Sequence, residues 1–216
     1  MLKKILMFLL VACMAAPMAY SQNKALEKAR KKEFKTKMKE YKKEGWKLFA
    51  SSRSLDVALL THYDKLNTMG EDAFEVTGVA SEFISNNVGK QSALNNACTY
   101  YASMAGSHVK GRIVSDLFGD GADPTGEFDR FYAAYERLVE KEIKGELMES
   151  YSIIRPKGVT KEGKKTYELQ TFYIVSEESA SKARMRAYEN ALKESEAAQR
   201  YGKQVADFVR EGFKGQ

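Results

Sequence analysis

The spacing of apolar residues changes along the chain, and one strand-to-helix change lies at its centre. The segment Phe74–Ala80 contains β-branched and aromatic residues with partial alternation, which predicts a strand covered in part on both faces. After a polar break at residues 86–89, residues on one helical face recur, namely Ala93, Ala97, Tyr101, Ala105 and Val109. Small side chains let a helix axis lie close to a sheet, so we expect this strand and helix to form the nucleus of the fold.

The residues before this nucleus predict two helices. From Asn23 to Glu44 the chain has helix-favouring Lys, Glu, Ala and Met and no Gly or Pro. Its apolar seam is thin and consists of Leu26, Ala29, Phe34, Met38 and Tyr41. Such a helix needs another element, a partner chain or a membrane surface to cover that seam. Residues 46–49 predict a short extended or turn segment, and Ser54 is the expected N-cap of a second helix that reaches Leu66.

The residues after the nucleus predict a helix, two strands and a last helix. Asp123 and Pro124 provide an N-cap and a first-turn proline for a helix that ends near residue 144. Strands at 146–155 and 164–175 flank a polar hairpin connection, and Ser176 caps a final long helix with an alanine-rich face and an expected bend near Gly202.

Together these patterns predict an α+β fold with a three-stranded antiparallel sheet covered by helices in the order β-α-α-β-β-α. A long basic N-terminal helix and a second helix precede this domain. We therefore divide the chain into a leader at 1–21, a basic helical extension at 22–70, and an α/β domain at 71–216 with a long C-terminal helix.

The N-terminal residues have the pattern of a signal peptide. Two lysines precede an apolar run at 5–16, and small residues occupy the two positions that a signal peptidase reads. The run is too short to span a bilayer comfortably. An alternative is a lipobox at 10–13, which would attach a lipid anchor to Cys13. We therefore expect an exported protein of the periplasm or outer membrane, in which Cys98 is a buried, inert thiol.

Charge is distributed unevenly along the 216 residues, whose formal net charge is +6. Residues 22–53 contain 12 Lys and Arg against 4 acidic residues, a net charge of +8. Basic helices bind phosphate groups, but an exported protein seldom meets nucleic acid, so anionic lipid or lipopolysaccharide is the better candidate partner. The predicted membrane or partner contacts are Lys28, Lys31, Lys32, Lys35, Lys39 and Lys42. The alternative is a solvated helix that packs on the C-terminal helix.

The order of elements resembles the lipoprotein-20 family of bacterial envelope proteins, which has a related domain at the start of a flagellar T-ring protein. Three segments carry the resemblance: Val76–Ala80, Gln91–Ala97 and Tyr167–Val175. The resemblance covers roughly residues 73–191, more than half of the chain without its leader. The resemblance implies a small α/β domain, with helices on a three-stranded antiparallel sheet, that acts as a structural or binding module without catalytic residues.

Residues that could carry chemistry are few. His62 and His108 lack metal-ligand spacing and are expected in the core or at its boundary. Ser107 adjoins His108, but neighbouring residues on a helix point about 100° apart and cannot form a dyad. We find no P-loop, G-x-S-x-G or G-x-G-x-x-G motif. The sequence predicts neither an enzyme nor a cofactor.

One acidic segment could hold an ion. Asp116, Asp120 and Glu127 fall at positions one, five and twelve of an EF-hand loop. Phe118 occupies a ligand position, so helix capping and solvation explain these acids better than calcium does.

The sequence therefore predicts a non-enzymatic envelope protein that binds or scaffolds. Its partner would be an envelope protein or a second copy, through the helical extensions, or an anionic lipid surface. The alternatives are a calcium-binding adaptor and an envelope enzyme whose site is assembled from residues far apart in sequence. A polar cleft with close carboxylates, or a histidine paired with one, would favour the enzyme.

Overall fold

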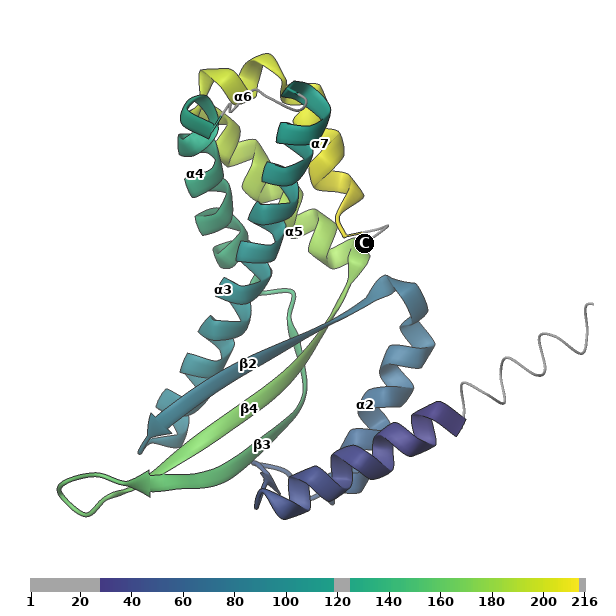
Figure 1. Cartoon of the computed structure of the whole chain (residues 1–216), viewed down its shortest axis with the longest axis vertical. Coiled ribbons are helices and arrows are strands. Elements are labelled where there is room, and N and C mark those ends of the chain that lie inside the picture. Colours follow the sequence, from purple (N-terminus) through teal and green to yellow (C-terminus); the bar gives the residue numbers. More distant parts are fainter. Residues whose placement is uncertain (1–27, 119–124, 214–216) are drawn as a thin grey trace, which may run out of the picture. The chain divides into compact units, whose positions relative to one another are not determined.

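A computed structural model describes residues 28–118 and 125–213 of the chain (Figure 1). The predicted leader, the alternative anchor residue Cys13, and Asp120 of the acidic segment lie outside these residues. The chain divides into two units, Met1–Trp46 and Lys47–Gln216. Each unit is described by itself.

The first unit contains a helix over residues 28–43, which confirms the described part of the predicted basic helix. Gly45 follows in the left-handed region with φ of 76°, a conformation that glycine adopts at no steric cost. The Trp46 backbone N–H then donates to the Tyr41 carbonyl at 2.9 Å, and its indole N–H donates to Glu44 at 3.0 Å. These bonds fix the end of the helix.

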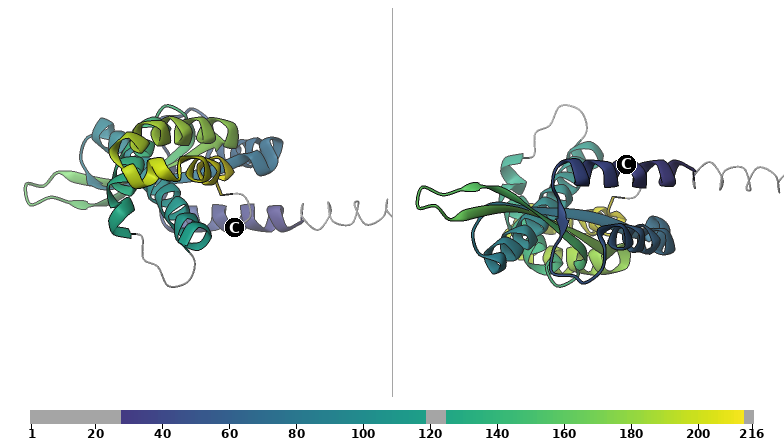
Figure 2. Two further views of the ribbon diagram at one scale, coloured as in Figure 1. Left: turned by 90° about the horizontal axis from the view of Figure 1, so that it is seen from above. Right: turned by 90° about the horizontal axis from the view of Figure 1, so that it is seen from below.

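The second unit contains a four-stranded antiparallel sheet in the order β1-β3-β4-β2. Its strands are β1 (Lys47–Leu48), β2 (Ala73–Phe83), β3 (Met148–Val159) and β4 (Lys165–Ser176). The prediction of three strands was wrong by one, because β1 is too short to show any periodicity. The β3–β4 hairpin is also longer than expected and projects beyond the helices of its unit (Figure 2). Pairing continues through Pro156 and Gly158, where a register shift accommodates both residues.

In the described part of the second unit, six α-helices surround this sheet or extend from it (Figure 1). They are α2 (Leu55–Met69), α3 (Asn86–Arg112), α4 (Thr125–Ile143), α5 (Glu177–Ala191), α6 (Glu196–Arg200) and α7 (Gly202–Glu211). Short 3-10 turns lie at Gly70–Asp72 and Leu192–Glu194, and a π-helical turn, Ile113–Phe118, extends α3. The predicted α+β class and the order β-α-α-β-β-α are confirmed. The residues predicted as a break at 86–89 instead form the first turn of α3.

The predicted long C-terminal helix is wrong, because the chain breaks twice after α5. Ser195 adopts an extended conformation, and its hydroxyl accepts a hydrogen bond from the Ala198 backbone N–H at 3.2 Å, which caps α6. A serine hydroxyl that bonds a nearby backbone group in this way competes with helix continuation. The alanine-rich face therefore folds back, and Ala198, Val205 and Val209 are buried in the core of the second unit.

Helices cover both faces of the sheet. Gly78 of β2 lies against the α3 backbone, whereas Glu75 bonds a side chain of α2. Successive residues of a strand point to opposite faces, so α3 and α2 lie on opposite sides of β2. The predicted inward face of α3 is confirmed, since Ala93, Ala97, Tyr101, Ala105 and Val109 are all at most 1% exposed.

A buried arginine joins α5 to the C-terminal residues. Arg184 is 1% exposed and donates to the Val209 carbonyl at 3.0 Å and to the Tyr101 hydroxyl at 2.7 Å. It also forms an ion pair with Glu177 at 2.5 Å, and its guanidinium lies 5.7 Å from the Phe213 ring centre. A charge removed from water is stable only with such partners, so Arg184 holds α7 in place.

Candidate functional site

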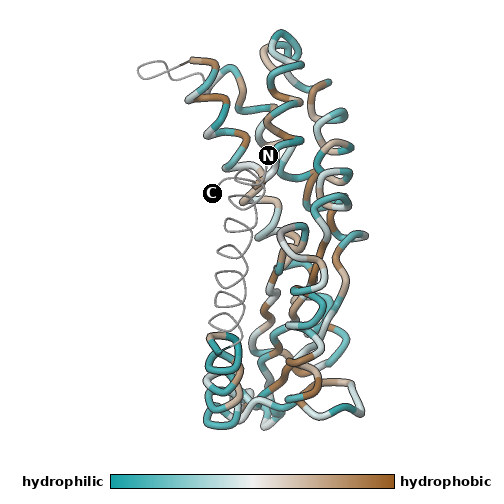
Figure 3. The backbone as a smooth tube through the Cα atoms, turned by 90° about the vertical axis from the view of Figure 1, so that its right-hand side faces the viewer, coloured by the Kyte–Doolittle hydropathy of each residue, from teal (hydrophilic) through white to brown (hydrophobic). Residues whose placement is uncertain are grey.

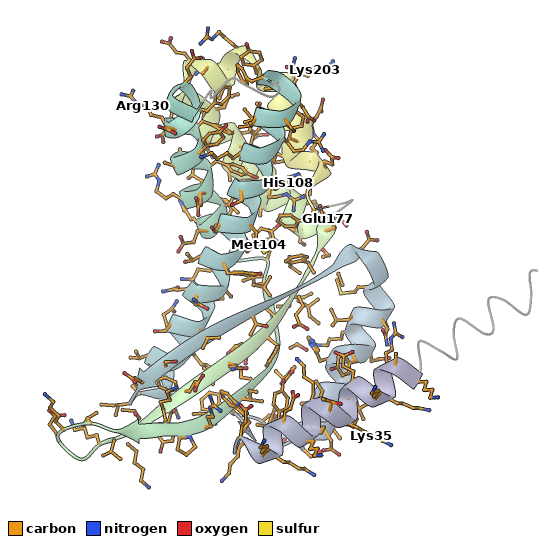
Figure 4. The ribbon with its side chains drawn as sticks, in the orientation of Figure 1. Lys35, Met104, His108, Arg130, Glu177 and Lys203 are labelled. Carbon is orange, nitrogen blue, oxygen red and sulfur yellow. The ribbon has the colours of Figure 1, made fainter. Side chains whose placement is uncertain are left out.

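The first candidate site is the exposed basic face of the helix at residues 28–43. This helix contains nine Lys and Arg and two Glu. All six predicted contact residues are exposed, namely Lys28, Lys31, Lys32, Lys35, Lys39 and Lys42. Figure 3 shows hydrophilic residues over most of this helix, and Figure 4 shows Lys35 extending away from it.

These six lysines share one side of the helix. At about 100° per residue they fall within an arc of about 100°, which we call the lysine face. Phe34, Met38 and Tyr41 fall in an adjacent arc of about 60°. The helix therefore carries a cationic face directly beside a narrow apolar stripe, the arrangement of helices that lie at an anionic interface.

In the second predicted site, the acidic segment, the described carboxylates form ion pairs with arginines. Asp116 forms an ion pair with Arg112 at 2.8 Å, and Glu127 forms one with Arg200 at 3.2 Å. Hydrogen bonds from Ser115 and then from Arg112 lower the pKa of Asp116. Within residues 28–118 and 125–213, no group of three His, Cys, Asp or Glu side chains is placed to hold a metal ion. Calcium binding by the whole loop stays a prediction, since Asp120 is outside those residues.

The third candidate site was not predicted and centres on His62. Helix α2 buries Ala58, Leu59 and His62, which lie on one helical face, and His62 is only 1% exposed. Its Nε2 lies 2.5 Å from a carboxylate oxygen of Glu75 on β2. Its Nδ1 lies 3.0 Å from the hydroxyl oxygen of Ser150 on β3. We call these three side chains the Ser–His–Glu cluster.

The partners of the imidazole define which nitrogen donates. An ionised carboxylate only accepts hydrogen bonds, so Nε2 must carry a hydrogen and donate it to Glu75. In a neutral imidazole Nδ1 then has a free lone pair and accepts from the Ser150 hydroxyl. Ser150 therefore donates to His62, and His62 donates to Glu75, so the two hydrogen bonds run in the same direction.

A β-bulge places Ser150 in this path. Glu149 pairs with Tyr173 and Tyr151 pairs with Phe172, so Ser150 is an extra residue that has no partner in the register of β4. A bulge of this kind redirects a side chain relative to regular pleating. The Tyr151 and Phe172 rings stack at 4.4 Å and pack at 5.2 and 6.1 Å from the His62 ring, which holds the imidazole between α2 and the sheet.

Ser150 also lines a cavity of about 330 Å³ beside β3. The lining residues come from β1 and the loop after it, from α2 and from β3. They are Leu48, Phe49, Ala50, Ser51, Arg53, Ala58, Thr61, Glu149, Ser150, Tyr151 and Ser152. Strand β1 pairs with β3 at Ile153 and Ile154, and the Phe49 backbone N–H also donates to the Ser152 carbonyl at 2.9 Å. The cavity therefore borders the part of β3 beyond that pairing, next to the bulge.

The other predicted residues lie apart from this cluster. His108 is on α3, where its ring packs 5.9 Å from Phe213, and burial lowers its pKa. Cys98 is 1% exposed, and burial raises the pKa of its thiol to about 11, which agrees with the expected inert cysteine.

One sign of the cluster was visible in the sequence, an inward-facing histidine on α2. Its two partners could not be chosen from the sequence, because Ser150 is 88 residues away and its orientation depends on the bulge.

Comparison with protein-family models, with curated proteins and with solved structures found no match to this chain. The resemblance to the lipoprotein-20 family therefore stays a prediction from the sequence. Among the described residues, no helix combines the length and the apolar character needed to cross a membrane.

Proposed function

We propose that this chain is an exported envelope protein that binds an anionic membrane surface through its lysine face and acts there as a binding or scaffolding module. The observation that carries the proposal is the concentration of six exposed lysines within one arc of the helix at 28–43. The signal-peptide pattern of residues 1–21 and the family resemblance support a location in the envelope.

The charge on this helix is large enough for surface attachment. A Lys or Arg near an anionic membrane contributes about 1 kcal/mol, so the six lysines could contribute up to about 6 kcal/mol together. Phe34 and Met38 lie beside them, are partly exposed, and could enter the boundary between headgroups and acyl chains, whereas Tyr41 is buried. Because the attraction is mainly electrostatic, salt must weaken it strongly.

The test is co-sedimentation of the purified protein with vesicles. Vesicles of phosphatidylcholine with phosphatidylglycerol should bind the protein at low salt, and vesicles of phosphatidylcholine alone should not. Binding should be largely lost at roughly 1 M salt, where the Debye length is about 3 Å. Replacement of Lys28, Lys31, Lys35 and Lys39 by Gln, which keeps helix propensity, should weaken binding at least tenfold.

A matched variant removes the same charge elsewhere. Lys161, Lys164, Lys165 and Lys203 are exposed residues of the second unit, and their replacement by Gln should leave most of the binding in place. If the two variants lose vesicle binding to the same extent, the lysine face is rejected as the binding site. Absence of binding to anionic vesicles at low salt would reject the proposal itself.

A further inference from the structure

The Ser–His–Glu cluster has parts that a purely structural contact would not need. A bond between His62 and Glu75 is enough to tie α2 to β2. Ser150 adds a hydroxyl at the wall of a cavity, and a bulge in β3 directs it toward the imidazole. The three side chains come from three elements, and Ser150 lies 88 residues from His62 in the sequence. This is the arrangement of a nucleophile, a base and a group that orients the base.

We propose that Ser150 is an activated nucleophile that attacks the carbonyl carbon of small acyl esters, with His62 as general base and Glu75 as the residue that positions His62. The proposal goes beyond surface attachment and does not depend on it.

The proton path is suited to this role. When the Ser150 oxygen forms a bond with the ester carbonyl carbon, its proton passes to Nδ1 of His62. The resulting imidazolium keeps its Nε2 bond to Glu75, whose negative charge stabilises the added positive charge. The imidazole is almost inaccessible to water at 1% exposure, whereas Ser150 is half-buried and reaches the cavity.

The remaining steps balance with water as the second reactant. Collapse of the tetrahedral intermediate breaks the carbon–oxygen bond to the alcohol, which takes the proton from His62. Water then attacks the acyl-serine, with His62 again taking a proton, and the carboxylic acid leaves as Ser150 regains its hydrogen. The net reaction converts an ester and water into an acid and an alcohol.

The cavity restricts the substrate class. A volume of 330 Å³ is near the lower end of small-molecule sites. Its lining includes the polar residues Ser51, Arg53, Thr61 and Glu149 beside Ser150. These features fit an ester with a short acyl group and a polar remainder better than one with a long hydrocarbon chain.

The experiment uses a fluorophosphonate, which a nucleophilic serine attacks at phosphorus with release of fluoride. The full chain is incubated with the probe, and the labelled residue is located by peptide mass spectrometry. Hydrolysis of p-nitrophenyl acetate is followed in parallel. We expect the label on Ser150, and we expect Ser150→Ala to lower both labelling and ester hydrolysis at least tenfold.

Two further variants separate catalysis from structure. Ser92→Ala removes an exposed serine of α3 that does not line this cavity, and it should leave both rates unchanged. Glu75→Gln keeps the size of the side chain and should slow labelling at least tenfold in protein that is folded by circular dichroism. If Glu75→Gln lowers stability but leaves the labelling rate unchanged, the cluster is only a structural contact. Absence of label on Ser150, or equal hydrolysis by Ser150→Ala and the wild type, would also overturn the proposal.

Discussion

Gly78 provides a direct test of the close packing between β2 and α3. A Cβ atom at this position would lie 2.0 Å from the Ala93 carbonyl oxygen, 2.8 Å from its carbonyl carbon and 3.1 Å from the Ala97 Cβ. The first two atoms belong to the helix backbone and cannot rotate away. To reach even 3.0 Å, the strand and the helix must separate by roughly 1 Å at this point, the difference between 3.0 and 2.0 Å.

Such a separation also affects the neighbouring contacts. The Asn96 side chain accepts a hydrogen bond from the Val79 backbone N–H at 3.0 Å, which ties α3 to the same strand. Added volume in a packed core costs about 1–3 kcal/mol and occasionally more. Because backbone atoms are involved, we expect Gly78→Ala to lower the free energy of unfolding by about 3 kcal/mol or more. For a chain of this size that corresponds to a decrease in Tm of about 6–12 °C.

The assay is urea unfolding followed by far-ultraviolet circular dichroism, with Gly111→Ala as the matched control. Gly111 is on α3, the helix that Gly78 contacts, and a Cβ at Gly111 meets no atom within 4 Å. Alanine favours helix over glycine by about 0.5–1 kcal/mol, so the control should be as stable as the wild type or more stable. If Gly78→Ala unfolds within about 0.5 kcal/mol of the wild type, the reasoning about backbone contact is refuted.

Three other groups give predictions that can be tested on the same protein. Arg184→Met leaves the partly buried Glu177 carboxylate and the Tyr101 hydroxyl without their partner, and urea unfolding should show a loss of about 3–5 kcal/mol. Cys98 has a pKa of about 11, so iodoacetamide at neutral pH should modify it slowly in the native protein and rapidly in urea, as measured by intact mass. Burial lowers the pKa of His108 in the folded state, so below about pH 6.5 the unfolded chain binds more protons than the folded chain. The free energy of unfolding therefore decreases as the pH is lowered through this range. Urea midpoints between about pH 7.5 and pH 5 should therefore decrease more in the wild type than in His108→Gln.

Local periodicity was enough to predict the order of the main elements. The face of α3 from Ala93 to Val109 could be identified because helical spacing depends only on neighbouring residues. Strand β1 could not be identified in this way, since Lys47 and Leu48 are too few to alternate and are extended only through pairing with Ile154 and Ile153. Its existence depends on β3, which lies a hundred residues further along the chain.

The C-terminal error has a different origin. The alanine-rich residues after Ser176 have high helix propensity and no proline, so one long helix with a bend near Gly202 was the expected result. The second unit instead folds these residues back, and Val205 and Val209 become buried in its core. Burial of apolar surface outweighs the small loss of helix continuity at Ser195, whose hydroxyl caps the next helix.

The candidate sites also differ in whether they depend on local sequence or on tertiary packing. The lysine face is a property of one helix, and its residues could be chosen from the sequence. The Ser–His–Glu cluster depends on how α2 packs on the sheet and on a single extra residue in β3. A shift of the β3 register by one residue would turn Ser150 to the other face of the sheet, so only the folded structure brings its hydroxyl to His62.

The two proposed activities can be separated by exchanging their variants between assays. The lysine face lies wholly in the first unit, whereas Ser150, His62 and Glu75 all lie in the second. Sites that act independently give additive effects, so the four-lysine variant should keep its full rate of fluorophosphonate labelling in solution. Ser150→Ala should bind anionic vesicles as the wild type does. If either variant impairs both activities in folded protein, the sites are coupled, and neither could then be assigned to one unit alone.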